Sequence, residues 1–250
     1  MSYIRIEKPR PHTSVIVMDR PERMNSMAFE QVVPLHDAIA EVAQDNDTWC
    51  VILTGVGRGF CSGADTQESE PPPNIAGLTL TRIATRAMSI LADLVPAMRR
   101  MPQPVIAAVN GAAVGVGVTM ILPCDIRIAA ERAKLGLTFT KLGILPGLGS
   151  THLLPRLVGL GRAQELVLTA RVIEAPEAAA IGLVNRVVPG DALLATAREV
   201  AAQSIACDPD ALAVAKRALH AGSMLDMAGA MQNERAANAE LRELKAKRSR

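Results

Sequence analysis

Residues 101–124 form an uncharged segment, MPQPVIAAVNGAAVGVGVTMILPC, in which Gly111, Gly115 and Gly117 stand close together. The segment is long enough for a transmembrane helix, which needs about 20 apolar residues, but prolines, an asparagine and the glycines interrupt it. The pattern instead predicts a strand, a glycine turn and the start of a helix. A helix start leaves backbone N–H groups unpaired, and these groups can bind an anion or a developing oxyanion. We therefore expect a binding or catalytic site at this turn.

A glycine turn after a strand is also typical of a dinucleotide-binding site. Gly115 and Gly117 match the first two glycines of the G-x-G-x-x-G fingerprint, but Met120 stands where the third should be. No acidic residue follows about 20 residues later, because residues 135–140 read LGLTFT. The sequence therefore does not predict a dinucleotide cofactor.

The cysteines and histidines show no spacing that is typical of a metal site or a redox pair. The four cysteines are far apart and include no C-x-x-C motif, so we expect reduced, mostly buried thiols and no bound metal. The histidines are scattered, and we interpret His152, which is near other candidate residues in the sequence, as structural. These residues are Cys50, Cys61, Cys124 and Cys207, and His12, His36, His152 and His220.

The composition argues against several classes of partner. Hydrophobic residues make up 49% of the 250 residues, aromatic residues only 2%, and the formal net charge is +2. Such a chain offers neither the stacking platforms nor the phosphate attraction of a nucleic-acid binder. The first residues, MSYIRIEKPRP, show no secretory signal. We therefore expect a cytoplasmic protein that binds neither nucleic acid nor a membrane.

The elements that must position the glycine turn alternate between strands and helices. This alternation continues to about residue 190, which predicts an α/β architecture with parallel strands. Residues 49–54 are almost wholly apolar, as a strand covered on both faces would be. The expected strands are residues 3–7, 13–18, 49–54, 104–109, 125–129 and 183–188, and the expected helices are residues 29–43, 78–98, 162–169 and 176–181.

From residue 192 onward the pattern is entirely helical, so we divide the chain into a core of residues 1–190 and a helical region of residues 191–250. Core packing is one interpretation of the apolar stripe in this region, and packing against another subunit is the other. The last ten residues, LRELKAKRSR, suit a solvated helix end, with contacts to ligand phosphates or an anionic membrane as alternatives. The stripe consists of Met224, Leu225, Met227, Met231, Leu241 and Leu244.

Six short motifs occur in order over almost the whole chain. They are RPERMNSM at 20–27, GRGFCSGAD at 57–65, PVIAAVNGAAVGVG at 104–117, CDIRIA at 124–129, LPRLVG at 154–159 and GLVNRVV at 182–188. Together they resemble the crotonase, or enoyl-CoA hydratase/isomerase, superfamily. The resemblance implies a crotonase-like spiral of ββα units, a C-terminal helical trimerisation region, and binding of acyl-CoA or enoyl-CoA thioesters by a homotrimer or a dimer of trimers. It implies no cofactor beyond the coenzyme A of the substrate.

The resemblance also implies an oxyanion hole made of two backbone N–H groups. Hydration or isomerisation of an enoyl thioester places negative charge on the thioester oxygen, and preplaced donors stabilise that charge. By motif position the donors are Ala64 and Val116. The family usually has glycine where this chain has Val116, and valine resists positive φ. We therefore expect a helix start with ordinary negative φ, or one that is slightly displaced.

Four residues fall where the family holds coenzyme A. Arg58, Phe60 and Ala64 correspond to positions near the adenine and the pantetheine arm, and Arg23 lies near that arm. Surface solvation is the alternative for both arginines. For Asp65, the resemblance implies a carboxylate that caps the loop rather than one that transfers a proton.

The acids that the resemblance would supply are missing. Two glutamates usually position a water and exchange a proton with the substrate, and their positions hold Thr119 and Phe139. Some relatives carry an aspartate at the position of Gly147. None of these residues can act as a base at neutral pH. Glu68, in the loop that covers the pocket in relatives, is the candidate substitute base, and solvation is its alternative role.

The sequence therefore predicts an acyl-CoA thioester enzyme of the enoyl-CoA hydratase/isomerase type, a lyase or isomerase of fatty-acid metabolism that stabilises a thioester enolate. Without the two glutamates, we do not expect ordinary hydratase activity. The alternative is a catalytically inactive acyl-CoA binding protein, which keeps the oxyanion hole but has lost proton transfer. Both functions require acyl-CoA binding, and they differ in turnover.

Overall fold

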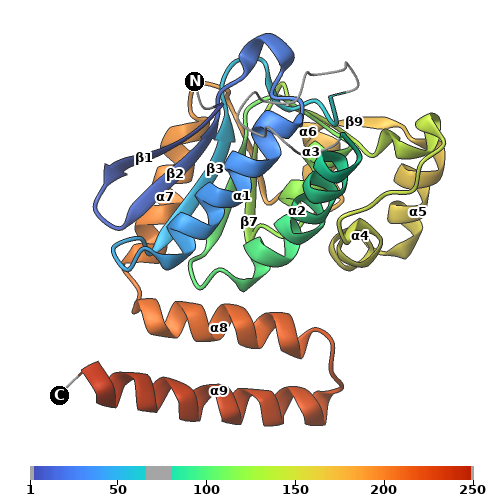
Figure 1. The fold of residues 1–250 in the computed structure, drawn as a ribbon. Coiled ribbons are helices and arrows are strands. Elements are labelled where there is room, and N and C mark those ends of the chain that lie inside the picture. The colour runs from blue at the N-terminus through green and yellow to red at the C-terminus, as the bar shows by residue number, and fades with distance from the viewer. Residues whose placement is uncertain (1–2, 66–79, 249–250) are drawn as a thin grey trace.

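The computed structural model describes residues 3–65 and 80–248 (Figure 1). In these ranges the larger sheet has six strands in the order β1-β2-β3-β5-β7-β10. β1 pairs antiparallel with β2, and the other neighbouring pairs are parallel, which confirms the predicted architecture. The strands are β1 (Ile4–Arg10), β2 (Thr13–Met18), β3 (Cys50–Gly55), β5 (Val105–Val109), β7 (Ile126–Ala130) and β10 (Arg186–Val188).

A smaller sheet of the described residues has four strands in the order β4-β6-β8-β9. β8 and β9 are antiparallel, and the other two pairs are parallel. The sequence analysis missed all four, because three residues are too few to show the alternation that marks a strand. The strands are β4 (Gly59–Cys61), β6 (Ala112–Val114), β8 (Lys134–Gly136) and β9 (Val172–Glu174).

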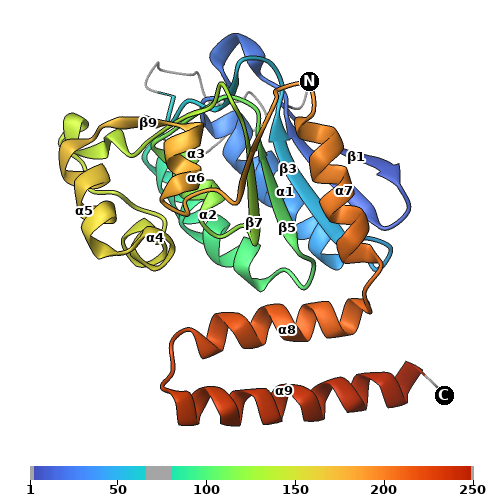
Figure 2. The same ribbon diagram turned by 180° about the vertical axis from the view of Figure 1, so that it is seen from behind.

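Helices cover both faces of the six-stranded sheet, as Figures 1 and 2 show from opposite sides. α1 (Phe29–Gln44) and α2 (Leu80–Arg100) pack against each other, and α7 (Leu193–Ile205) packs on the sheet. The strand β2 serves both layers, because Ile16 belongs to the hydrophobic cluster of α1 and Val17 to the cluster of α7. Burial on both faces explains the continuous apolar runs of these strands.

Of the other helices, α5 and α6 lie close to their predicted ranges, whereas the sequence analysis did not predict η2 or α4. One neighbouring strand was also predicted with an error. The expected strand 183–188 is wrong over its first three residues, because β10 starts at Arg186. The N–H groups of Leu183 and Val184 instead donate to the carbonyl of Ala178, which closes the end of the preceding helix. These elements are α3 (Val116–Ile121), the 3₁₀ helix η2 (Thr138–Leu142), α4 (Ser150–Val158), α5 (Leu160–Thr169), α6 (Ala175–Ala180), α8 (Pro209–Gly222) and α9 (Met227–Arg248).

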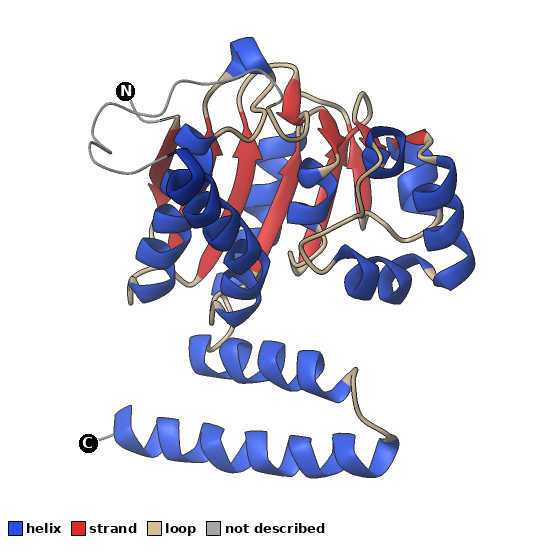
Figure 3. Ribbon diagram, turned by 45° about the vertical axis from the view of Figure 1, so that its right-hand side comes forward, coloured by secondary structure: helices blue, strands red, loops and turns tan. Residues whose placement is uncertain are grey.

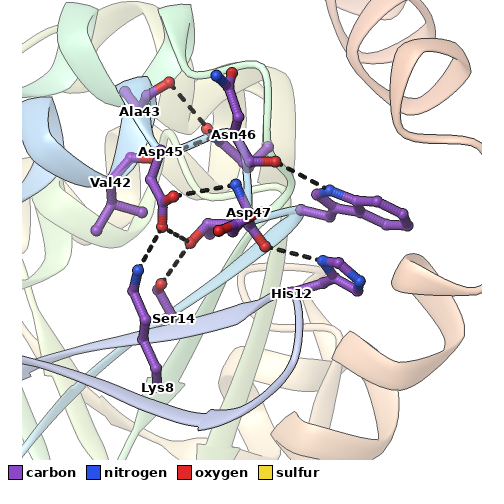
Figure 4. Close-up of polar contacts among 11 residues, drawn as sticks. Lys8, His12, Ser14, Val42, Ala43, Asp45, Asn46 and Asp47 are labelled. Atoms are coloured by element: carbon purple, nitrogen blue, oxygen red, sulfur yellow. Dashed lines mark hydrogen bonds and ion pairs between the residues drawn. The ribbon is translucent and has the colours of Figure 1, made fainter.

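A network of side chains closes the turn between α1 and β3 (Figure 4). The Asp45 carboxylate accepts hydrogen bonds from the Lys8 ammonium at 2.8 Å and from the Thr48 hydroxyl at 2.6 Å. The hydrogen bond from Lys8 is the main cause that lowers the pKa of Asp45 to about 2. Nearby, the His12 ring stacks on the Trp49 indole with 3.8 Å between the ring centroids. This polar turn ends α1, as the sequence pattern predicts.

The uncharged segment 101–124 folds as β5, then β6 within the glycine turn, then α3. β4 and α3 approach each other so closely that only glycine fits between them. A Cβ atom at Gly117 would overlap the carbonyl of Cys61, and one at Gly111 would overlap the carbonyl of Arg58. Neither glycine has a positive φ, so space alone requires glycine at both positions. Among the helices described, none is both long and apolar enough to cross a membrane.

The helices α8 and α9 form a hairpin below the sheets (Figures 1 and 3). α9 packs on α8, and the described part of α9 has no buried residue. The core-packing interpretation of the apolar stripe is wrong for Met224, Met227 and Met231, which are 52%, 78% and 48% exposed. α7 belongs to the same region of the sequence but packs on the six-stranded sheet. The division of the chain at residue 190 stays a prediction.

The buried ammonium group of Lys216 holds α8 to the core. Its Nζ lies 2.8 Å from the Asp125 carboxylate and donates to the Gln103 carbonyl at 2.9 Å. The same carboxylate accepts a hydrogen bond from the Val105 N–H at 2.7 Å. Because Val105 begins β5 and Asp125 precedes β7, this contact joins α8 to the amino ends of two central strands.

Lys216→Met would leave the Asp125 carboxylate without its cation in a largely buried place. We expect this variant to lose about 3–5 kcal/mol in the free energy of unfolding, measured by urea denaturation. The matched control is Arg217→Met, because the exposed ion pair of Arg217 with Glu240, at 2.6 Å, contributes at most about 1 kcal/mol. Equal losses in the two variants would show that Lys216 does not hold α8 to the core.

Gly117→Ala would place a methyl group against the Cys61 carbonyl, so β4 and α3 would have to separate. We expect this variant to lose about 2–3 kcal/mol in thermal unfolding experiments. Gly161→Ala, in open space on α5, is the control and should be neutral or gain about 0.5–1 kcal/mol. A Gly117→Ala protein as stable as the wild type would contradict the close approach.

Candidate active site

Segments that are far apart in the sequence meet beside the start of α3. Gly63 and Gly115 both adopt positive φ, at +113° and +53°. A Cβ atom built at Gly115 would lie 3.9 Å from the Gly63 Cα and 3.8 Å from the ring of Phe139. One built at Gly63 would lie 3.3 Å from the Val114 carbonyl oxygen. The two glycine turns therefore lie against each other, with the aromatic ring beside them.

Ala64 follows the first of these turns and is exposed. It forms an isolated parallel bridge with Met27, in which the Met27 N–H donates to the Gly63 carbonyl and the Asp65 N–H donates to the Met27 carbonyl. The middle residue of such a bridge directs its own N–H away from the partner segment. Among the described residues, none accepts a hydrogen bond from the Ala64 N–H.

Val116 is the first residue of α3, so its N–H is one of the unpaired donors of a helix start. Gly115 takes the positive φ at the N-cap, and Val116 itself has a negative φ. An ordinary helix start was one of the two arrangements expected for valine at this position. Within residues 3–65 and 80–248, nothing accepts a hydrogen bond from the Val116 N–H, whereas the Thr119 N–H donates to the Gly115 carbonyl at 3.1 Å.

The side chain of Asp65 is 4% exposed and paired with two arginines. Its carboxylate accepts hydrogen bonds from Arg20 at 2.9 Å, from Arg23 at 2.8 Å and from the Ser26 hydroxyl at 3.2 Å. These charge-assisted bonds tie the loop that carries Ala64 to the segment before α1. These contacts fit a carboxylate that holds the loop in place better than one that transfers a proton. Sequence reasoning missed Arg20 and Ser26, although both lie in the RPERMNSM motif.

Thr119 and Phe139, where the sequence resemblance implies glutamates, are both buried. Thr119 is fully buried, and its hydroxyl donates to the Val116 carbonyl at 2.9 Å, within the first turn of α3. Phe139 is 8% exposed and places its ring beside Gly115. Gly147 lies in an exposed loop, where a Cβ atom would meet no other atom within 4 Å.

The residues expected to contact coenzyme A differ in accessibility. Phe60 is fully buried in the main hydrophobic cluster, so only its backbone can line the surface. Arg58 is exposed, whereas Arg23 is half-buried and directs one nitrogen to Asp65. Glu68, the candidate substitute base, lies outside the described residues.

Cys61 lies beside the two turns, where its Sγ donates to the Gly63 carbonyl at 3.9 Å. Burial raises the pKa of the Cys61 thiol to about 12, so this neighbour of α3 is not a nucleophile at neutral pH. His152 lies on α4 and lines a cavity with Arg99 and Arg100 that includes none of the described candidate site residues. In the described ranges, no group of histidine, cysteine and carboxylate side chains could hold a metal ion.

Comparisons with known proteins agree with this fold. The enoyl-CoA hydratase/isomerase family matches residues 12–248. A probable enoyl-CoA hydratase of Mycobacterium bovis is 43% identical over 229 residues, which cover 89% of this chain and 78% of that protein. The crystal structure of an enoyl-CoA hydratase from Bacillus anthracis is 38% identical with a TM-score of 0.87, and the match covers 99% of this chain and 96% of that one.

A monofunctional enoyl-CoA isomerase from M. smegmatis is 39% identical with a TM-score of 0.79, and the match covers 93% of this chain and 99% of that one. The mixed α/β core and the helical C-terminal region are therefore those of solved hydratases and isomerases alike. The chain belongs to the enoyl-CoA hydratase/isomerase, or crotonase, superfamily.

Proposed function

We propose that this chain binds acyl-CoA or enoyl-CoA thioesters and holds the thioester oxygen between the N–H groups of Ala64 and Val116. The observation that carries the proposal is that the two glycine turns lie against each other and leave both groups without an acceptor among the described residues. The substrate class follows relatives such as the enoyl-CoA hydratase from Bacillus anthracis. Coenzyme A is part of the substrate, and the proposal includes no other cofactor.

Two preplaced donors stabilise an enolate but do not move a proton. Hydration and isomerisation both need a group that takes a proton from the substrate or gives one to it. Thr119, whose hydroxyl is bound to a backbone carbonyl, Phe139 and Gly147 do not supply that group. We therefore propose an enzyme of the hydratase/isomerase type that does not catalyse ordinary glutamate-dependent hydration. Glu68 is the substitute base in this proposal.

A second candidate function is acyl-CoA binding without turnover. Two polar side chains near the donors favour it, because both are already engaged in hydrogen bonds within the protein. The Asp65 carboxylate is paired with two arginines, and the Thr119 hydroxyl donates to a carbonyl within α3. The Phe139 ring beside Gly115 would then exclude water from the acyl group, as apolar linings of ligand sites do.

The remaining parts of the proposal concern the assembly and the coenzyme A arm. We propose that residues 191–250 mediate a homotrimer or a dimer of trimers. The exposed methionines of α9 and of the connection between α8 and α9 support this proposal. Arg23, Arg58 and the Phe60 backbone would contact coenzyme A. A cytoplasmic role in fatty-acid metabolism completes the proposal.

Enoyl-CoA substrates and deuterium exchange distinguish the two functions. We expect calorimetry to show acyl-CoA binding, and the absorbance of crotonyl-CoA to stay constant because no glutamate positions a water. Exchange of acyl-CoA α-protons in deuterated water, lost in Glu68→Gln with unchanged binding, would identify an enzyme. Binding without exchange would identify the binding protein. Rapid hydration of crotonyl-CoA, or no acyl-CoA binding, would contradict the proposal.

Val116→Pro removes the second donor while keeping α3. Proline is favoured at the first position of a helix, and its fixed φ suits the negative φ found there. We expect the infrared carbonyl stretch of bound acyl-CoA to return towards its free frequency, and any turnover to fall about 100- to 1000-fold. Val116→Ala keeps the N–H and is the matched control. An unchanged carbonyl stretch in bound Val116→Pro would refute the assignment.

A further inference from the structure

A cavity of about 490 Å³ lies at the amino ends of the central strands of the six-stranded sheet, away from the two glycine turns. Its walls come from α8, from the ends of α2 and α4, and from the segment that joins α3 to β7. The carboxylate of Asp125, which lines the cavity, accepts a hydrogen bond from the N–H at the amino end of β5. The two glycine turns instead follow β4 and β6, the short strands that come after the carboxyl ends of β3 and β5. Of the candidate active-site residues that the structure describes, none lines this cavity.

Positive charge predominates in this cavity. Among the described residues, four basic side chains, those of Arg99, Arg127, Arg156 and Lys216, line it with a single carboxylate, that of Asp125. The chain as a whole is almost balanced, with 27 basic and 25 acidic residues. The excess is therefore local, and a cleft with one sign of charge attracts oppositely charged ligands.

Two of these cations are already engaged by the protein. Lys216 is paired with Asp125 at 2.8 Å, and Arg127 donates to two backbone carbonyls. Among the described residues, Arg99 has neither an ion pair nor a hydrogen-bond acceptor, and Arg156 donates only to a backbone carbonyl at 3.0 Å. Arg99 and Arg156 are therefore the two charges that a ligand can neutralise.

The nearby histidines respond to the same excess of charge. Burial lowers the pKa of His220, and the charges of Arg99 and Lys216 lower it further, while Asp125 opposes the shift. Burial also lowers the pKa of His152, and Arg156 and Arg99 add to the shift. Both rings are therefore mostly neutral at pH 7, and an anion in the cavity would raise both pKa values.

Helix ends account for part of this arrangement. Arg99 lies in the last turn of α2 and Arg156 in the last turn of α4, where the helix dipole favours a cation. The dipoles explain why each helix ends in a basic residue. They do not explain why both helix ends meet Lys216 of α8 at one cavity, or why Arg99 has no acceptor among the described residues.

We propose that this cavity binds a small phosphomonoester, with the phosphate between Arg99 and Arg156 and the organic group against an apolar wall. A phosphomonoester carries about −1.5 to −2 charges at pH 7, which matches two unneutralised arginines. The volume of the cavity is larger than a bare phosphate ion needs, and it falls within the range of about 300–1,000 Å³ that is typical of small-molecule sites. The apolar wall consists of Leu122, Leu153, Leu157 and Leu219.

Calorimetry of the full chain at low salt tests this proposal, with phenyl phosphate and inorganic phosphate as probes and chloride at matched ionic strength as the screening control. We expect phenyl phosphate to bind, and Arg99→Gln to weaken its binding at least tenfold without lowering the unfolding temperature. Arg162→Gln, exposed on α5 and outside the cavity, is the matched control. No binding at millimolar phenyl phosphate, equal binding by the two variants, or binding of inorganic phosphate alone would overturn the proposal.

Nuclear magnetic resonance titration of the histidines gives a second readout. Bound phenyl phosphate should raise the pKa of His220, because the dianion offsets the charge of Arg99. If the His220 pKa instead rises with protein concentration and ignores phenyl phosphate, a carboxylate of a second copy fills the cavity. That result would also overturn the proposal.

Discussion

Backbone contact between β4 and α3 determines where the donors of this molecule lie. Gly117 allows the first turn of α3 to touch the Cys61 carbonyl, and Gly111 allows the preceding turn to touch the Arg58 carbonyl. A side chain at either glycine would push the two segments apart and carry Ala64 away from Val116. The parallel strands, covered by helices on both faces, supply the rigid frame for this contact, and the arginine pair on Asp65 fixes the loop from the other side.

An oxyanion site built from backbone groups does not depend on the side chains around it. The N–H groups of Ala64 and Val116 keep their positions whether residue 119 is an acid or, as here, a threonine bound within its own helix. Proton transfer, by contrast, needs particular side chains. In the proposed function, thioester binding therefore does not depend on the side chains of Thr119 and Phe139, and this separation underlies both functions considered for the chain.

Strands that are buried on both faces could be predicted from the sequence. Short strands, and ion pairs between residues far apart in the chain, could not. The apolar run 49–54 predicted the strand Cys50–Gly55, because burial on both faces demands apolar side chains throughout. The three-residue strand β4 has no such pattern. The ion pair between Arg20 and Asp65 joins residues 45 positions apart, which no local pattern encodes.

Sequence motifs singled out Ala64 and Val116 as the candidate donors. The burial of the Phe60 side chain, by contrast, became visible only in the folded chain. The exposed Met224, Met227 and Met231 show the same limit, because an apolar stripe does not reveal whether its partner lies in the same chain.

The most direct test of the central claim is a crystal structure of this protein with a bound acyl-CoA. The account predicts a thioester oxygen within about 2.7–3.1 Å of both the Ala64 and the Val116 nitrogen atoms, the distance at which oxyanion donors act. A bound acyl-CoA whose thioester oxygen meets neither nitrogen atom would contradict it.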